Sequence, residues 1–177
     1  MQPVHSALLI VDMQVGLFYA PQQPFEKARV LSNINQLIRR ARTARVPILA
    51  VRHSGPEGSP IAIGAPFWQL LPELELAPQT DALFNKYRPS CFFETGLDER
   101  LAQAGIRELV VAGMKTDYCI DTTCRVASEL GYKVQLAADA HTTMDSPHLS
   151  APAIIEHHNH VLNGPFARVL KTADIRF

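Results

Sequence analysis

The sequence predicts an α/β fold in which a parallel sheet is covered by helices on both faces. Short apolar runs of strand length alternate with segments of helical periodicity along the whole chain, which is typical of such a sheet. The chain has 177 residues, 47% of them hydrophobic, which is enough to bury a substantial core. We therefore expect residues 1–177 to form a single domain.

Three strands and one long helix are predicted in the first half of the chain. The first strand is Ala7–Val11, and the second and third are Pro47–Val51 and Ala82–Asn85. The segment Lys27–Arg45 is predicted to be an amphipathic helix, because its apolar residues recur every three or four positions on one stripe. The third strand leads directly into Lys86.

A long segment, Arg52–Gln79, separates the second and third strands and is rich in proline and glycine. It is predicted to be a mostly irregular excursion. Its apolar residues, which include Phe67 and Trp68, are too numerous for a disordered segment. Long loops in compact domains are usually functional, so we interpret this one as a wall or lid beside a site.

The second half of the chain continues the alternation. A helix is predicted to begin with Thr95 as its N-cap, with Asp98 in a capping-box-like position, and to stop at Gly105. The remaining predicted elements are the strands Leu109–Ala112, Lys133–Ala137 and Phe166–Lys171 and the helix Ala151–Leu162.

Composition and charge exclude several classes of function. Seventeen basic and seventeen acidic residues give no net charge, so we expect neither nucleic acid nor a membrane surface as a partner. No apolar run approaches the roughly 20 residues that cross a bilayer. The first residues lack a signal-peptide pattern, and the three cysteines fit neither a disulfide framework nor a zinc site, so we expect a cytoplasmic protein. Because weak net charge tolerates self-association, we expect a homo-oligomer, either a dimer or a tetramer.

The position of Cys119 suggests a nucleophile. It follows an apolar strand and a tight turn, and it opens a segment with helical periodicity. A thiol at the positive end of a helix is expected to have a lowered pKa, which favours the reactive thiolate. The alternative is that Cys119 is a small buried hydrophobic residue, and position alone does not decide between the two.

Three reactive residues follow predicted strands: Asp12, Lys86 and Cys119. Ligands of open parallel sheets bind beyond the carboxyl ends of the strands, so these side chains are expected to converge on one pocket that takes a small-molecule substrate. There Asp12 would accept the thiol proton and Lys86 would keep that carboxylate ionised. Taken singly, Asp12 fits the cap of a turn equally well, and Lys86 fits an exposed strand end better. The conjunction favours catalysis.

Other candidate residues carry weaker signals. His53 follows the second strand and is expected either to contact substrate or to satisfy a buried backbone group. Aromatic residues of the pocket would stack on a flat substrate, but they would serve equally well to cover the core or to pack against a second subunit. The histidines near position 158 are interpreted as a solvated helix face rather than a metal site. The candidate pocket residues are Phe18, His53, Trp68 and Tyr118.

Three motifs in this order resemble the signature of the isochorismatase-like cysteine hydrolases. They are Val11-Asp12-Met13-Gln14, Lys86, and Gly113-Met114-Lys115-Thr116-Asp117-Tyr118-Cys119-Ile120. The likeness spans nearly the whole chain, through Asp139-Ala140-His141-Thr142-Thr143 and His157-His158-Asn159. That superfamily includes nicotinamidases, N-carbamoylsarcosine amidases, ureidoacrylate amidases and a streptothricin hydrolase.

The resemblance implies a three-layer α/β/α fold with a six-stranded, mostly parallel sheet. It implies an Asp12–Lys86–Cys119 catalytic triad and a cis peptide bond between Met114 and Lys115. It also implies that the backbone N–H groups of Lys115 and Cys119 form the oxyanion hole.

Departures from the family pattern bear on the substrate. Nicotinamidases carry an Asp-x-His metal motif after the second strand, but this chain has Val51-Arg52-His53-Ser54 there, so we expect no metal and no other cofactor. The sequence therefore predicts a hydrolase that cleaves a C–N bond of a small non-peptide amide, lactam or ureido compound through a Cys119 thioester. The alternative is a vinyl-ether hydrolase of the isochorismatase type with Asp12 as general acid. A non-catalytic binding protein is a further alternative, whereas dinucleotide binding lacks its Gly-x-Gly-x-x-Gly motif.

Overall fold

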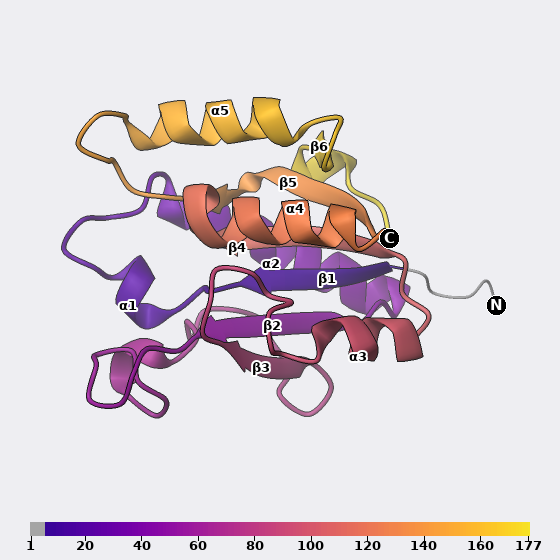
Figure 1. Ribbon diagram of the computed structural model, residues 1–177, viewed down its shortest axis with the longest axis horizontal. Coiled ribbons are helices and arrows are strands. Elements are labelled where there is room, and N and C mark those ends of the chain that lie inside the picture. The colour runs from indigo at the N-terminus through magenta and orange to yellow at the C-terminus, as the bar shows by residue number, and fades with distance from the viewer. Residues whose placement is uncertain (1–5) are drawn as a thin grey trace.

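In the computed structural model, which describes residues 6–177, six strands form one parallel sheet in the order β3-β2-β1-β4-β5-β6 (Figure 1). This confirms the predicted α/β fold. The strands are β1 (Ser6–Val11), β2 (Ile48–His53), β3 (Ala82–Lys86), β4 (Glu108–Met114), β5 (Lys133–Thr142) and β6 (Arg168–Leu170). The helices are α1 (Val15–Phe18), α2 (Lys27–Ala44), α3 (Leu97–Gln103), α4 (Asp121–Glu129) and α5 (Ala151–Leu162).

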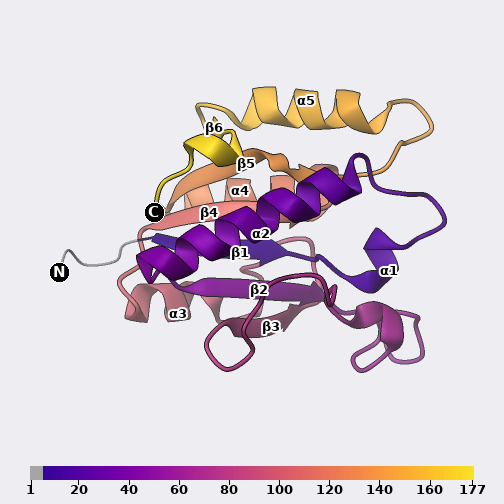
Figure 2. The ribbon, with the colours of Figure 1, turned by 180° about the vertical axis from the view of Figure 1, so that it is seen from behind.

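Helices cover both faces of the sheet and bury two apolar layers. Figure 2 shows α2 lying across one face, and Figure 1 shows α3 and α4 on the other. Successive residues of β1 point to opposite faces, so Leu8 and Ile10 join the core beneath α2, while Leu9 and Val11 join the core beneath α3 and α4. Because the central strands are buried on both faces, they read as continuous apolar runs in the sequence.

Several predicted boundaries are corrected by the structure. The strand β5 extends five residues beyond the predicted end, to Thr142, and β2 continues through His53 into the segment predicted to be irregular. The final strand is shorter than predicted, covering only Arg168–Leu170. The short helix α1 was not predicted, because four residues are too few to show a helical period. None of these changes moves the end of β1 or of β4 by more than two residues.

The start of α3 differs from the predicted capping box. Gly96, in the left-handed conformation with φ 68°, precedes the helix, and Thr95 lies one position earlier. The Thr95 hydroxyl still accepts a hydrogen bond from the Leu97 N–H, at 3.2 Å. Asp98 accepts a hydrogen bond from the Tyr132 hydroxyl at 2.6 Å instead of closing the box, so long-range packing overrides the local signal.

Gly113 is required where β1 and β4 meet beneath the site. Its φ is +126°, and a Cβ there would lie 2.1 Å from the backbone oxygen of Val11, its register partner. We expect Gly113→Ala to lower the free energy of unfolding by more than about 3 kcal/mol, because both the clash and the positive φ act against alanine. Urea denaturation measures the change. Gly105→Ala is the control, since its φ is also positive but nothing lies within 4 Å of the added Cβ. Equal losses in the two variants would contradict this account.

Among residues 6–177, no helix combines the length and apolarity that crossing a bilayer requires.

Candidate active site

Three strand ends bring Asp12, Lys86 and Cys119 together at the carboxyl edge of the sheet. Asp12 follows β1, Lys86 is the last residue of β3, and Cys119 lies in the π-helical turn Thr116–Ile120 between β4 and α4. The Lys86 Nζ lies 2.7 Å from the Asp12 Oδ2 and 3.1 Å from the Cys119 Sγ. Lys86 reaches past β2 to make these contacts, because β3 is the edge strand and does not adjoin β1. The exposed fraction is 0% for Lys86, 1% for Asp12 and 9% for Cys119.

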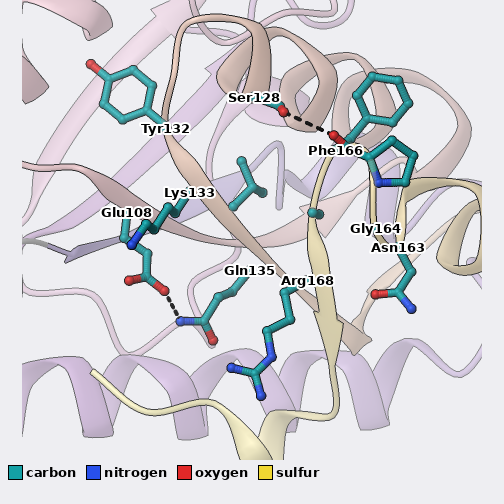
Figure 3. Close-up of a pocket in the computed structure, with 12 residues that line it drawn as sticks. Glu108, Ser128, Tyr132, Lys133, Gln135, Asn163, Gly164, Phe166 and Arg168 are labelled. Atoms are coloured by element: carbon teal, nitrogen blue, oxygen red, sulfur yellow. Dashed lines mark hydrogen bonds between the residues drawn. The ribbon is translucent and has the colours of Figure 1, made fainter.

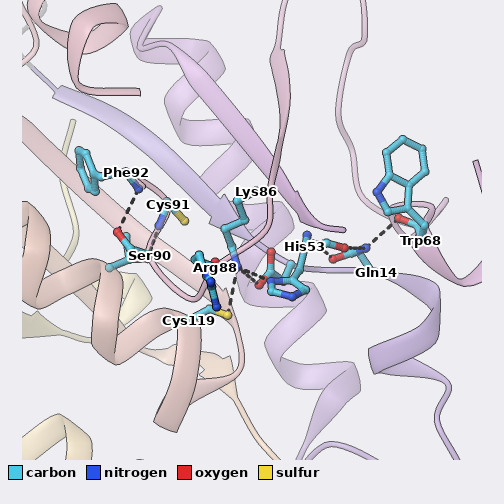
Figure 4. Close-up of polar contacts among 11 residues, drawn as sticks. Gln14, His53, Trp68, Lys86, Arg88, Ser90, Cys91, Phe92 and Cys119 are labelled. Carbon is cyan, nitrogen blue, oxygen red and sulfur yellow. Dashed lines mark hydrogen bonds and ion pairs between the residues drawn. The ribbon is translucent and has the colours of Figure 1, made fainter. Parts of the chain in front are cut away.

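Lys86 has two further partners, as the contacts in Figure 4 show. Its Nζ lies 3.1 Å from the His53 Nδ1 and donates to the Arg88 carbonyl at 3.2 Å. Burial lowers the pKa of Lys86, but its neighbours, above all the Asp12 carboxylate, together raise it by more, so the pKa is raised overall. Lys86 is therefore an ammonium group whose three N–H donors are shared among four neighbours, Asp12, His53, the Arg88 carbonyl and Cys119.

His53 is the neutral neighbour of this group. Burial and the nearby Lys86 ammonium lower its pKa. Its Nδ1 faces an ammonium group, which has no acceptor to offer, so Nδ1 is the acceptor and Nε2 carries the proton. Within residues 6–177 the His53 Nε2 has no hydrogen-bond partner, which leaves it as a donor for a bound molecule.

Asp12 is a buried carboxyl group at the end of β1. Burial raises the pKa of its carboxyl group, and the Lys86 ammonium acts in the opposite direction. One carboxylate oxygen binds Lys86, while the other, Oδ1, is buried and has no hydrogen-bond partner in the described part of the chain. A carboxylate oxygen of Asp12, a ring nitrogen of His53 and the Cys119 Sγ lie within 4.8 Å of one another. The Asp12 carboxyl group therefore lies close to the thiol and has one oxygen, Oδ1, without a partner.

The predicted lowering of the Cys119 pKa is wrong. Burial raises the pKa of this thiol to about 12, and the Asp12 carboxylate raises it further, against the opposing effect of Lys86. The helix α4 begins two residues later, at Asp121, so an acidic side chain rather than Cys119 occupies its first turn. This raised pKa favours the neutral thiol over the thiolate.

The turn that carries Cys119 begins at an unusual peptide bond. The bond between Met114 and Lys115 is cis. The Lys115 carbonyl accepts hydrogen bonds from the N–H groups of Tyr118 and Ile120, at 3.2 and 3.1 Å. These bonds fold the turn back on itself, so that Lys115 and Cys119 both line one cavity.

That cavity has a volume of about 370 Å³ and opens beside Asp12 and Cys119. His53 and Tyr118 line it, as expected from the sequence, whereas Phe18 and Trp68 do not. Phe18 is buried in the core, edge-on to Tyr19. The full lining is Asp12, Gln14, Leu17, His53, Ile61, Pro89, Lys115, Tyr118 and Cys119.

Trp68 does not line the cavity but packs with Ser54 and Arg52 in a layer next to it. Its Nε1 donates to the Ser54 hydroxyl at 2.9 Å, and the Arg52 guanidinium lies 3.7 Å from its ring centroid. Gln14 connects this layer to the site, because its Nε2 donates to the carbonyls of His53 and Trp68 while its Oε1 accepts from the His53 N–H. Sequence reasoning gave Gln14 no role, since its partners are backbone groups far along the chain.

A second group that the sequence left without a role is the buried His141, which fixes the turn that carries Cys119. Its Nε2 lies 2.9 Å from the Asn159 Oδ1. The Asn159 amide donates to the Ala138 carbonyl at 3.2 Å, so its Oδ1 faces the imidazole as an acceptor and Nε2 carries the proton. The remaining nitrogen, Nδ1, accepts from the Thr116 hydroxyl at 2.8 Å. This chain of bonds ties α5 and β5 to the turn before Cys119.

His141 is expected to make stability fall in mild acid. Burial lowers its pKa from 6.5 to about 4, so the unfolded chain takes up a proton that the folded chain refuses. This stabilisation is present above pH 6.5 and is lost as the pH falls toward 4. Its loss amounts to about 2 kcal/mol between pH 7 and pH 5. Urea denaturation at both pH values measures it, and His141→Gln removes it. The exposed His148→Gln is the control, and an undiminished pH effect in His141→Gln would contradict the assignment.

The site residues do not fit a metal ion. Asp12, His53 and Cys119 are the one group of potential ligands found close together among residues 6–177. The Lys86 ammonium already lies within 3.1 Å of all three, so a cation would meet a fixed positive charge there. The nitrogen of His53 that faces this point is moreover the acceptor for Lys86.

A larger cavity of about 550 Å³ lies at the opposite end of the sheet, beside the first residues of β4 and β5 (Figure 3). Its lining includes Glu108 and Lys133, and a hydrogen bond joins Gln135 to Glu108. It contains none of the residues that the sequence singled out as reactive.

Comparisons with known proteins give consistent results. The family model of the isochorismatase domain matches residues 6–174. A streptothricin hydrolase of Streptomyces noursei is 37% identical over 84% of this chain and 53% of its own length, so the chain spans about half of that relative. The ureidoacrylate amidohydrolase RutB of Pseudomonas syringae is 30% identical over 79% of this chain and 71% of its own. The crystal structure of an isochorismatase family protein superposes with a TM-score of 0.89 at 34% identity, over 96% of this chain and 99% of the other.

Proposed function

Because this chain belongs to the isochorismatase family, we propose that it is a hydrolase that cleaves a C–N bond of a small non-peptide amide, lactam or ureido compound through a Cys119 thioester. The observation that carries this proposal is the buried contact of Lys86 with both Asp12 and Cys119. A nucleophile, a base and a cation that holds the base ionised are the groups that acyl transfer needs. The amidohydrolase among the relatives supports the same reaction class.

In the first half of the proposed reaction, the Cys119 sulfur attacks the substrate carbonyl carbon. As the C–S bond forms, the thiol proton moves to the unpaired Oδ1 of Asp12, whose raised pKa suits it to receive a proton. The carbonyl electron pair becomes an oxyanion held by the N–H groups of Lys115 and Cys119, at about 3 kcal/mol of barrier lowering for each donor. Asp12 then gives its proton to the nitrogen, the C–N bond breaks, and the amine or ammonia leaves.

In the second half, water replaces the amine. Asp12 removes a proton from water as the water oxygen attacks the thioester carbon, and the same two N–H groups hold the second oxyanion. The C–S bond breaks, the acid departs, and Asp12 returns the proton to the Cys119 sulfur. Lys86 donates no proton in these steps, and its pKa is raised by Asp12 whenever that carboxyl group is ionised.

A vinyl-ether hydrolase is the second candidate. The observation that favours it is the raised pKa of Asp12, which suits a general acid that protonates the vinyl ether of an isochorismate-like acid. In that reaction no thioester forms, and alkylation of Cys119 blocks activity only by filling the cavity.

A substrate panel separates the two candidates. Small amides, lactams and ureides are assayed by ammonia release and by chromatography of the acid product, and isochorismate by its disappearance. The proposal predicts turnover of at least one nitrogen compound and loss of that turnover after alkylation of Cys119. Turnover of isochorismate alone, undiminished in Cys119→Ala, would establish the second candidate instead.

A further inference from the structure

The cavity beside Cys119 carries one uncompensated charge. Only two of its nine lining residues are charged, Asp12 and Lys115. The Asp12 carboxylate is neutralised by Lys86 at 2.7 Å, and burial together with the same ammonium group lowers the pKa of His53, which favours its neutral form. Among the described residues, no carboxylate lies within ion-pair distance of Lys115. A bound molecule therefore meets a net positive field from Lys115.

The Lys115 ammonium is held at the cavity instead of extending freely into solvent. Its Nζ lies 4.7 Å from the ring centroid of Tyr118, which also lines the cavity and is 54% exposed. A cation over an aromatic face gains about 0.5–1 kcal/mol at an exposed site, which favours this placement without removing the charge. The nearest acidic residue in sequence, Asp117, is turned to the Thr143 hydroxyl, 2.6 Å away.

We propose that the Lys115 ammonium binds a carboxylate of the substrate, so that the substrate class is an amide or ureide that also carries an acid group. The inference rests on the proposed function, because it takes the scissile carbonyl to lie against Cys119. One residue then makes two contacts: its backbone N–H holds the carbonyl oxygen, and its side chain holds the carboxylate. The two groups of the substrate are therefore separated by no more than the reach of one lysine side chain.

The other walls of the cavity agree with a compact acidic substrate. Leu17, Ile61 and Pro89 are apolar and cover the carbon skeleton, while the His53 Nε2 offers one further donor. A volume of about 370 Å³ is at the lower end of the range for ligand sites. Arg52, a candidate carboxylate ligand by residue type, is stacked on Trp68 and does not line the cavity.

The test uses two alkylating probes that differ in charge, iodoacetate and iodoacetamide. Each reacts with the same sulfur, so the pKa of Cys119 cancels from the ratio of their rate constants. Peptide mass spectrometry follows Cys119 separately from the buried Cys91 and Cys124. With glutathione as reference, we expect the iodoacetate-to-iodoacetamide ratio to be above one in the wild type and to fall about five- to tenfold in Lys115→Met. Salt lowers the ratio of the wild type but not that of the variant.

Lys133→Met is the matched control, since this exposed lysine begins β5 at the far end of the sheet, and its ratio stays at the wild-type value. An equal ratio in the wild type and Lys115→Met overturns the inference but leaves the proposed function standing. A fall in Arg88→Met in place of Lys115→Met also overturns it and moves the charge to Arg88. If neither probe modifies Cys119, the proposed nucleophile fails and the inference fails with it.

Discussion

Replacing Cys119 with alanine is expected to lower kcat by about 10³-fold or more, because the atom that bonds to the substrate is removed. The fold is expected to survive, with the free energy of unfolding changed by no more than about 1 kcal/mol, since a small apolar group replaces a small one. Steady-state rates on the substrate found in the panel, together with urea denaturation, measure both effects.

Cys124→Ala is the matched control for this change. Cys124 is fully buried on α4 and does not line the cavity, so its loss is expected to leave kcat within about twofold while costing similar stability. A Cys119→Ala protein that turns over an amide at the wild-type rate would contradict covalent catalysis.

Replacing Lys86 with methionine is expected to give the largest loss of stability among the site variants, about 3–5 kcal/mol. The Asp12 carboxylate would remain buried without its cation, and its Oδ2 would lose the partner now 2.7 Å away. In the wild type the Lys86 ammonium opposes the effect of burial on the pKa of Asp12, so its removal is expected to raise that pKa further. A higher pKa leaves less of Asp12 as the carboxylate that accepts the thiol proton, so activity is expected to fall as well.

The double variant Asp12→Asn with Lys86→Met separates charge from packing. With no charge left at the site, most of the stability lost in Lys86→Met is expected to return, but activity is not. Urea denaturation of the wild type, both single variants and the double variant gives the coupling energy between the two residues. A Lys86→Met protein that loses less than about 1 kcal/mol, or a double variant no more stable than it, would contradict a buried ion pair.

The alternation of strands and helices and the location of the site follow from patterns in the sequence itself. The central strands are apolar on both faces, so their runs stand out, and reactive residues lie at or soon after the ends of β1, β3 and β4. Parallel strands place such positions at one edge of a sheet, which is why Asp12, Lys86 and Cys119 were expected to converge. The sequence did not indicate that Lys86 reaches its partners from an edge strand, past the end of β2.

What the sequence could not supply depends on tertiary structure. The pKa of Cys119 was predicted from its place near a helix, but burial and a carboxylate from another strand determine it. Phe18 lies in the four-residue helix α1 and Trp68 in the three-residue 3₁₀ turn Pro66–Trp68, and both elements are too short to show a period from which the side-chain direction could be predicted. Gln14 acts through His53, which lies 39 residues away in the sequence, and His141 acts through Thr116, which lies 25 residues away.

The most direct test of the central claim, that Cys119 is the covalent nucleophile, is mass spectrometry of protein quenched with acid during turnover. The measurement is made on the wild type, with Cys119→Ala as the control, because Asp12 acts in both the formation and the release of the thioester and its loss would prevent acylation. In the wild type we expect a mass increase equal to the acyl group of the substrate, located by peptide mapping on Cys119, and none in Cys119→Ala. A steady turnover by the wild type in which the Cys119 peptide stays unmodified, or an acyl group found on another residue, would contradict the covalent role of Cys119.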